Sequence, residues 1–285
     1  MKKLIYLLSL TLVCCLWSGI AQALLIDPYD NVLPPDGSYG LLYGNYYHAG
    51  ELTGAGGDKA ADLDLTATVS LLRSSNYFHV GKLPLGFQVI LPFGRIEEKK
   101  LLNESSSGLG DIVFGPGIFL HSRETDTLKT YLSYWFYTFA PTGAWDKDKT
   151  INLGQHHWYF EHQLAFNAQL KSFVYDMNLN FYHHIEDSSN KLKRPGRFEV
   201  ETSLGYQVTD KLLVGVNGGG YWDGNASKVD GIAVADSKAE RFQFGPTISY
   251  SITDKLGANL RWTHDVSSTN DTKGDDVWLR FSYAF

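Results

Sequence analysis

The chain has 285 residues, of which 44% are hydrophobic and 20% are charged, and its formal net charge is −6. This acidic balance argues against a nucleic-acid partner, because nucleic-acid binding requires a basic surface. After the N-terminal region, no stretch approaches the roughly 18 consecutive apolar residues of a membrane-spanning helix.

The N-terminus has the features of a cleaved signal peptide. Lys2 and Lys3 precede an apolar run over residues 4–17, and Ala21–Ala23 forms a small-x-small cleavage site. A membrane anchor is the weaker alternative, since the run is shorter than the ~20 residues that a spanning helix needs. We therefore expect residues 1–23 to be removed on export.

The mature chain is predicted to be one domain with a short lead-in. Residues 24–37 contain Pro34–Pro35, which cannot lie inside a sheet, and we interpret them as a periplasmic lead-in. Residues 38–285 contain no linker and no change of composition. Both cysteines, Cys14–Cys15, lie in the segment that is removed, so the mature protein has no disulfide and no cysteine-ligated metal.

Stretches in which apolar and polar residues alternate recur along residues 38–285, and this period of two predicts strands. In one of them, Leu63 and Leu65 alternate with Asp62 and Asp64. The predicted strands cover residues 38–48, 61–72, 77–93, 109–121, 128–140, 156–169, 172–184, 197–208, 212–223, 241–252, 256–265 and 276–285.

The connections between these strands are alternately short and long. The short ones fall at 73–76, 122–127, 170–171, 209–211 and 253–255. The long ones fall at 49–60, 94–108, 141–155, 185–196, 224–240 and 266–275. An even number of strands with short periplasmic turns and long outer loops is typical of bacterial outer-membrane barrels. The predicted fold is all-β: a transmembrane antiparallel up-and-down β-barrel of about 12 strands, in the outer membrane of a Gram-negative bacterium.

Aromatic residues gather near both ends of the strands, on the face of each strand that carries the apolar side chains. The outer group is Trp158, Phe198, Trp222 and Phe242, and the inner group is Phe173, Tyr206, Tyr250 and Phe285. Their spacing of about eight residues corresponds to roughly 20 Å along tilted strands, close to the height of an apolar membrane band. A soluble sandwich or lipocalin-like barrel, the main alternative, does not account for two such belts. The C-terminal strand ending at Phe285 is the expected contact for the barrel-assembly machinery.

The face of each strand that carries the polar side chains is expected to line the lumen. The candidate lumen residues are Asp62, Asp64, Tyr137, Tyr159, Glu161, Gln163, Asn167, Asp176, Asn178, Tyr182, Glu199, Glu201, Arg261 and Arg280. Two interpretations remain open: a hydrogen-bonded plug that braces the wall, and a narrow path suited to a small amphiphilic aromatic compound. The acidic excess favours cations or neutral solutes over anions.

Two short motifs are predicted at the outer rim. Gly108–Asp111 (GLGD) ends a long loop and opens the strand predicted at 109–121. Phe139–Gly143 (FAPTG) ends a strand, because proline cannot donate to the sheet and glycine permits a turn. The candidate rim or gating residues are Gly108, Gly110, Asp111, Pro141, Thr142 and Gly143. Loop packing and ligand gating both remain possible roles.

These motifs also carry a family resemblance. Together with Asp36–Leu41 (DGSYGL) near the start of the barrel, and with Asn152–Gly154 and Trp158, they resemble the outer-membrane proteins named for the meta-pathway of phenol degradation. The resemblance covers nearly all of the mature chain in order. It implies a barrel that passes hydrophobic or aromatic compounds across the outer membrane.

Clustered histidines and loop lysines are candidates for other chemistry. The histidines are His156, His157, His162, His183 and His184. Because His157 and His162 have opposite parity, we favour an interfacial role over a metal site, and we expect no cofactor. The loop cations Lys99, Lys100, Lys147, Lys149, Lys191, Lys193, Arg194, Lys228, Lys238 and Lys273 could pair with lipopolysaccharide phosphates or remain solvated.

The sequence therefore predicts a channel and not an enzyme. The expected function is passive diffusion of small hydrophobic or aromatic solutes through a barrel surrounded by outer-membrane lipid and lipopolysaccharide. One alternative is a plugged structural barrel. Another is a lipid-modifying enzyme with an active site at the rim, although the chain has no Gly-x-Ser-x-Gly sequence.

Overall fold

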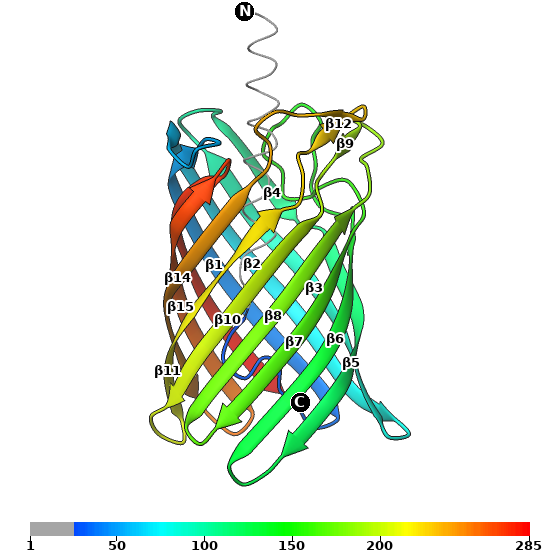
Figure 1. The fold of residues 1–285 in the computed structure, drawn as a ribbon, viewed down its shortest axis with the longest axis vertical. Helices are drawn as coiled ribbons and strands as arrows, with labels where there is room; N and C mark the ends of the chain where they lie inside the picture. Colours follow the sequence, from blue (N-terminus) through cyan, green and yellow to red (C-terminus); the bar gives the residue numbers. More distant parts are fainter. Residues whose placement is uncertain (1–25) are drawn as a thin grey trace, which may run out of the picture.

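A computed structural model describes residues 26–285, and the predicted signal peptide lies outside the described residues. The described chain forms a closed antiparallel β-barrel whose strands are tilted against the barrel axis (Figure 1). It contains no helix that is long and apolar enough to cross a membrane. The predicted fold class is confirmed, including the number of strands in the wall.

Twelve strands follow one another around the wall, and β1 closes the barrel by pairing with β16. They are β1 (Gly37–Thr53), β2 (Lys59–Val80), β3 (Leu83–Glu98), β5 (Ile112–Glu124), β6 (Leu128–Ala140), β7 (Tyr159–Leu170), β8 (Phe173–His184), β10 (Arg197–Gln207), β11 (Leu212–Asp223), β14 (Glu240–Ser251), β15 (Leu256–Thr269) and β16 (Thr272–Ala284).

The two ends of the barrel differ as predicted. The short turns lie at the end where β1 begins and β16 finishes, which we call the inner end (Figure 1). The opposite, outer end carries the long loops, as the extracellular end of bacterial barrels does. Two predicted long loops are wrong, because β1 and β2 meet across residues 54–58 and β15 and β16 across residues 270–271. The predicted loop segments 49–60 and 266–275 are rich in glycine and polar residues, so the alternation that marks a strand is weak there.

The first inner turn was also predicted in the wrong place. Residues 73–76 resemble a turn in composition, yet β2 continues through them to Val80. Ser75 lies opposite both Tyr39 on β1 and Gln88 on β3, so its neighbours on either side hold it in the sheet. The turn comes at residues 81–82, and the next strand begins at Leu83 instead of residue 77.

Additional short strands occur in the outer connections. β4 (Glu104–Leu109) extends the wall beside the outer part of β3. A separate small sheet joins β9 (Leu192–Lys193), β12 (Lys228–Val229) and β13 (Ile232–Ala233) above the barrel (Figure 1). Strand pairing thus ties the 185–196 loop to the 224–239 loop.

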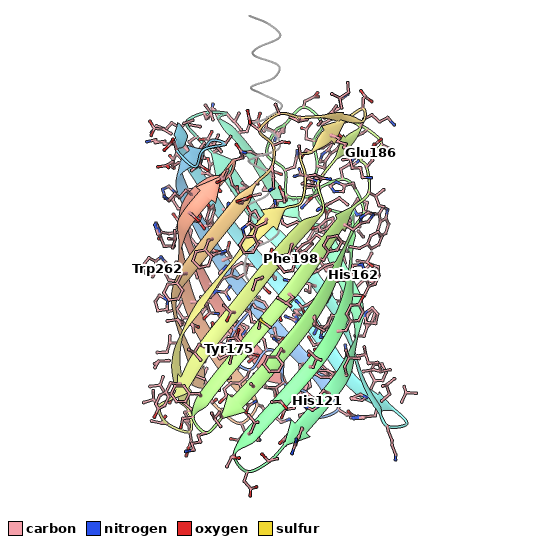
Figure 2. The ribbon with its side chains drawn as sticks, in the orientation of Figure 1. His121, His162, Tyr175, Glu186, Phe198 and Trp262 are labelled. Atoms are coloured by element: carbon pink, nitrogen blue, oxygen red, sulfur yellow. The ribbon has the colours of Figure 1, made fainter. Side chains whose placement is uncertain are left out.

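The lipid-facing surface carries both predicted aromatic belts. Every member of the outer and inner groups is exposed on the outside of the barrel, and Phe198 and Trp262 project from the wall in Figure 2. Aliphatic residues such as Leu164, Leu204 and Ile248 are exposed between the belts. Such exposure would be unfavourable in water and is the expected pattern for a wall in contact with lipid.

Candidate functional site: the barrel lumen

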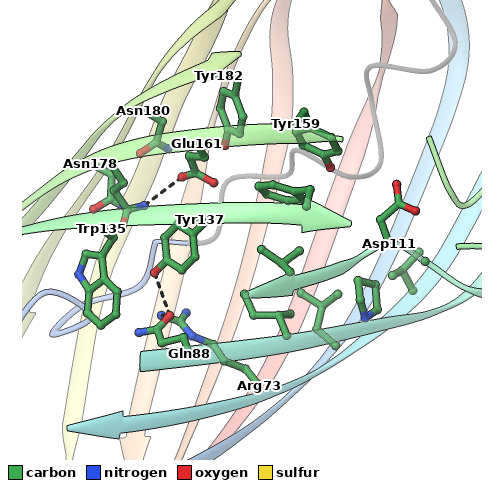
Figure 3. A pocket seen from close by; sticks show the side chains of 18 of the residues that line it. Arg73, Gln88, Asp111, Trp135, Tyr137, Tyr159, Glu161, Asn178, Asn180 and Tyr182 are labelled. Carbon is green, nitrogen blue, oxygen red and sulfur yellow. Dashed lines mark hydrogen bonds between the residues drawn. The ribbon is translucent and has the colours of Figure 1, made fainter. Parts of the chain in front are cut away.

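A cavity lies in the lumen beside β2, β3, β5, β6 and β7 (Figure 3). Asp30 and Asn31, which precede β1, line its inner part. Ile151 and Leu153, from the loop after β6, line its outer part. The cavity therefore lies between the N-terminal segment and the 141–158 loop.

One wall of the cavity is apolar. On β2 the inward residues are the apolar ones, and Leu63 and Leu65 are 3% and 1% exposed. The lining side chains that β2, β3, β5 and β6 contribute to this wall are Val69, Leu71, Ile90, Ile96, Val113, Phe119, Trp135 and Phe139. On strands such as β10 and β14 the apolar residues face lipid, so the alternation is reversed on β2.

This reversal corrects two lumen predictions. Asp62 and Asp64 lie on the outward parity of β2, and the Asp62 side chain is 57% exposed, beside Lys59 and Lys100. Alternation shows that the two faces of a strand differ, but it does not show which face is inside. This part of β2 extends beyond the outer aromatic belt, where outward polar residues meet water.

Stacked aromatic rings line the lumen along the boundary of the apolar wall. Trp135 and Tyr137 on β6 stack with centroids 5.8 Å apart. Higher on the same strand, Phe139 stacks on Tyr159 at 4.0 Å, and Tyr159 stacks on His184 at 4.9 Å. The cavity therefore offers flat π surfaces over much of its height.

The other predicted lumen residues have their side chains inside the barrel. They are Tyr137, Tyr159, Glu161, Gln163, Asn167, Asp176, Asn178, Tyr182, Glu199, Glu201, Arg261 and Arg280. Those on β7, β8 and β10 form a polar wall opposite β2 and β3, in which the Asn178 amide donates a 2.7 Å hydrogen bond to Glu201. The lumen is therefore apolar on one side and polar on the other.

Buried ion pairs occupy the remaining part of the lumen. Arg197 binds Asp223 at 2.7 Å, and Arg241 binds Asp271 at 2.9 Å. All four side chains are at most 6% exposed. Pairs desolvated to this degree brace the wall beside β10, β11 and β14, and the open cavity lies away from them.

The segment before β1 runs inside the barrel. Asp176 accepts hydrogen bonds from the backbone amides of Tyr29 and Asn31, at 2.8 and 3.1 Å. Arg261 binds the Asp27 carboxylate at 3.2 Å, and Ile26 is fully buried. The sequence did not predict this position, because these partners lie more than 140 residues away in the chain.

The two rim motifs come together and hold the 141–158 loop. Asp111 accepts a 2.9 Å hydrogen bond from the Gly143 amide and a 2.7 Å bond from the Gln155 amide. The Thr142 hydroxyl accepts a 3.0 Å bond from the Ile112 amide. A Cβ at Gly143 would lie 2.6 Å from the Gly154 Cα, so this contact requires glycine. We refer to this arrangement as the rim clasp.

Among the other rim residues, Gly108 has a backbone φ of +134°, which favours glycine, and Gly110 donates a 2.8 Å bond to the Pro92 carbonyl. Pro141 follows directly after the last residue of β6, as its lack of an N–H donor requires. These geometries account for the two motifs as packing elements of the rim.

The histidines separate into different environments. His157 and His184 form a buried pair with 3.0 Å between their ring nitrogens, and burial lowers the pKa of His157 to about 4. His162 lies on the outer surface and contacts the Tyr134 hydroxyl at 2.7 Å (Figure 2). Within residues 26–285, no group of three or more His, Asp or Glu side chains is arranged to hold a metal ion.

A polar cluster on the apolar wall was not predicted from the sequence. Arg73 on β2 and Gln88 on β3 both line the cavity, and they meet Tyr137 on β6 (Figure 3). Because residues 73–76 were predicted as a turn, Arg73 was not recognised as a residue of a strand that faces the lumen. The available signal was the parity that Arg73 shares with the inward residues Val69 and Leu71.

A closed barrel with two aromatic belts, long outer loops and a partly apolar lumen defines this protein as an outer-membrane β-barrel. The chain matches the family described as "Putative MetA-pathway of phenol degradation" over residues 49–281, and it belongs to that family. The search of curated proteins found no match.

Solved structures share the fold. An outer membrane channel from Pseudomonas putida F1 superimposes with a TM-score of 0.83 at 24% identity, covering 91% of this chain and 100% of that one. The NanC porin superimposes with a TM-score of 0.50 at 7% identity, covering 86% of this chain and 100% of the porin. At these identities the likeness supports the architecture, and the solute must be argued from the lumen itself.

Proposed function

We propose that this protein is a passive outer-membrane channel for small hydrophobic or aromatic compounds. The apolar wall of the lumen cavity carries the proposal. A pore for sugars or ions gains nothing from Leu71, Ile90 and Val113 facing its interior, whereas an apolar solute gains about 25 cal/mol for each Å² of surface that it buries there. The stacked rings of Trp135 and Tyr137 provide flat contacts for an aromatic ring.

The polar wall and the N-terminal segment are expected to control passage. A solute that leaves the cavity toward the inner end meets Asp30 and Asn31. Residues 26–32 are held by hydrogen bonds to Asp176, Asn217 and Arg261, so passage requires a path around this segment or its displacement. Saturable transport is expected, because solute enters a defined cavity before it crosses this barrier.

The proposal extends to the targeting and surroundings of the barrel. We propose export after cleavage of residues 1–23, followed by assembly through the C-terminal strand that ends at Phe285. The loop lysines are proposed to meet lipopolysaccharide phosphates, since Lys147 and Lys191 lie in the outer loops. The start of β1 and the end of β16 would then face the periplasm.

The decisive experiment is uptake of a labelled small aromatic compound by cells with and without the protein. Leu71→Trp would fill part of the cavity, and Leu72→Trp is the matched control because Leu72 faces lipid and is 48% exposed. We expect the protein to accelerate uptake, and Leu71→Trp alone to reduce it at equal amounts of folded barrel. Equal uptake with and without the protein would reject the channel and favour a plugged structural barrel.

A further inference from the structure

Arg73 places a positive charge on the apolar wall of the cavity. It lies on β2 directly after the inward residues Val69 and Leu71, and its side chain reaches Gln88 on β3 (Figure 3). An arginine side chain stays charged at any pH that the protein meets. A charge at this position therefore calls for a partner.

The hydrogen-bond partners of Arg73 are neutral. One terminal nitrogen donates to the Gln88 side-chain oxygen at 2.7 Å, and the other donates to the Tyr43 hydroxyl at 3.3 Å. The Nε atom is buried without a hydrogen-bond partner in the described chain. No carboxylate of residues 26–285 forms an ion pair with Arg73, and Asp30, which lines the same cavity, is paired with Arg280.

Other buried arginines of the lumen are neutralised. Each contacts a carboxylate: Arg197 with Asp223, Arg241 with Asp271, Arg261 with Asp27 and Arg280 with Asp30. Arg73 differs from these residues in facing the open cavity instead of the filled part of the lumen. Its guanidinium is thus available to a molecule that enters the cavity.

The groups around Arg73 determine which class of molecule can bind there. A guanidinium binds a carboxylate through two parallel N–H donors, and such charge-assisted bonds are about twice as strong as neutral ones. Two tyrosines hold Gln88 toward Arg73. The Tyr137 hydroxyl donates a 2.8 Å hydrogen bond to the Gln88 side-chain oxygen, and the Gln88 amide nitrogen donates a 3.3 Å bond to the Tyr77 hydroxyl. Beyond this polar cluster the wall is apolar, with Ile90 and Trp135.

We propose that Arg73 is the head-group site of the cavity and that the channel takes hydrophobic carboxylates, in particular aryl carboxylates. The carboxylate binds Arg73 beside Gln88, and the ring lies against the apolar wall near Trp135. This inference rests on the proposed channel function and adds the class of substrate. It differs from the expectation drawn from net charge, because Arg73 offers an anionic head group a local cation that forms no salt bridge within residues 26–285.

The facing wall sets the orientation of the bound molecule. Glu161 on β7 and Glu201 on β10 line the cavity opposite β2 and β3 and repel an anionic head. The head group is therefore directed to Arg73, and the uncharged end of the molecule meets the facing wall. A second carboxylate at that end would be repelled, so monocarboxylates are favoured over dicarboxylates.

The test measures binding of 4-phenylbutyrate and of its neutral analogue 4-phenylbutan-1-ol, by equilibrium dialysis against the mature protein in nanodiscs. Empty nanodiscs give the background. Arg73→Gln removes the charge and keeps hydrogen-bonding atoms. Arg95→Gln is the matched control, because Arg95 lies on the outer surface and is 56% exposed. Heat-modifiable migration on gels confirms that each variant is a folded barrel.

We expect the wild type and Arg95→Gln to bind the carboxylate more tightly than the alcohol. Arg73→Gln should weaken carboxylate binding by about tenfold or more, corresponding to the loss of charge-assisted hydrogen bonds, and leave alcohol binding unchanged. Arg73→Lys should keep the preference for the carboxylate with reduced affinity.

Two results would overturn the assignment while leaving the channel proposal intact. One is equal or weaker binding of the carboxylate relative to the alcohol by the wild type. The other is an equal loss of both ligands in Arg73→Gln, which would show a structural role. If neither compound binds the wild type above the nanodisc background and neither crosses the membrane faster with the protein, the proposed channel function itself fails.

Discussion

The rim clasp allows a quantitative prediction about the loop that covers the cavity. Asp111 is 6% exposed and accepts the backbone amides of Gly143 and Gln155. Asp111→Ala removes the acceptor of both and leaves two poorly solvated N–H groups. Each such group costs about 1–3 kcal/mol, so the closed position of the loop should lose roughly 2–6 kcal/mol.

The measurement is amide hydrogen exchange in peptides that cover residues 141–158. A loss of about 2 kcal/mol corresponds to roughly 30-fold faster exchange through local opening, and this is the smallest effect we expect. Asp148→Ala is the control, because Asp148 lies in the same loop with an exposed side chain. The wall strands should keep their protection in both variants.

Unchanged exchange at Gly143 and Gln155 in Asp111→Ala would refute this account of the clasp. The rim motifs would then act on the barrel in some other way, for example during assembly. Faster exchange in both variants would also contradict it, because a general loosening of the loop does not depend on the Asp111 carboxylate.

Three further predictions concern pH, the lumen and the lipid face. Burial lowers the pKa of His157 to about 4, so the closed 141–158 loop should lose stability as pH falls from about 6.5 toward 4, by about 2 kcal/mol at pH 5. His157→Gln should remove this pH dependence, measured as amide exchange rates corrected for the intrinsic effect of pH on exchange. Asp176→Ala should free residues 26–32 and raise single-channel conductance in planar bilayers, and an unchanged conductance would show that the segment does not limit ion flow. Leu164→Lys, midway between the aromatic belts, should destabilise the barrel by about 2–4 kcal/mol in denaturant unfolding from liposomes, whereas a change near zero would place this residue outside the apolar band.

Much of the architecture follows from the sequence because a membrane barrel imposes a local rule on most of its strands. Lipid contact requires an apolar residue at every second position, and the interfaces favour aromatics such as Trp158 and Phe198. Turn composition at 209–211 and 253–255 then separates the strands. The rim motifs were likewise recognisable, since glycine and proline mark positions where the backbone must turn or approach closely.

Other features depended on the closed barrel. Alternation along β2 shows two different faces, but only its pairing with β1 and β3 turned Leu65 inward and Asp64 outward. The polar ends of β15 and β16 carry no alternation and form strands because each is hydrogen-bonded to its neighbours. Residues 26–32 contact strands far along the chain, and Arg73 meets Gln88 and Tyr137 only in the folded wall. The sequence therefore determined the barrel and its place in a membrane, through constraints that act within each strand. The contents of the lumen were decided by tertiary structure, because they depend on which side chains face one another across it.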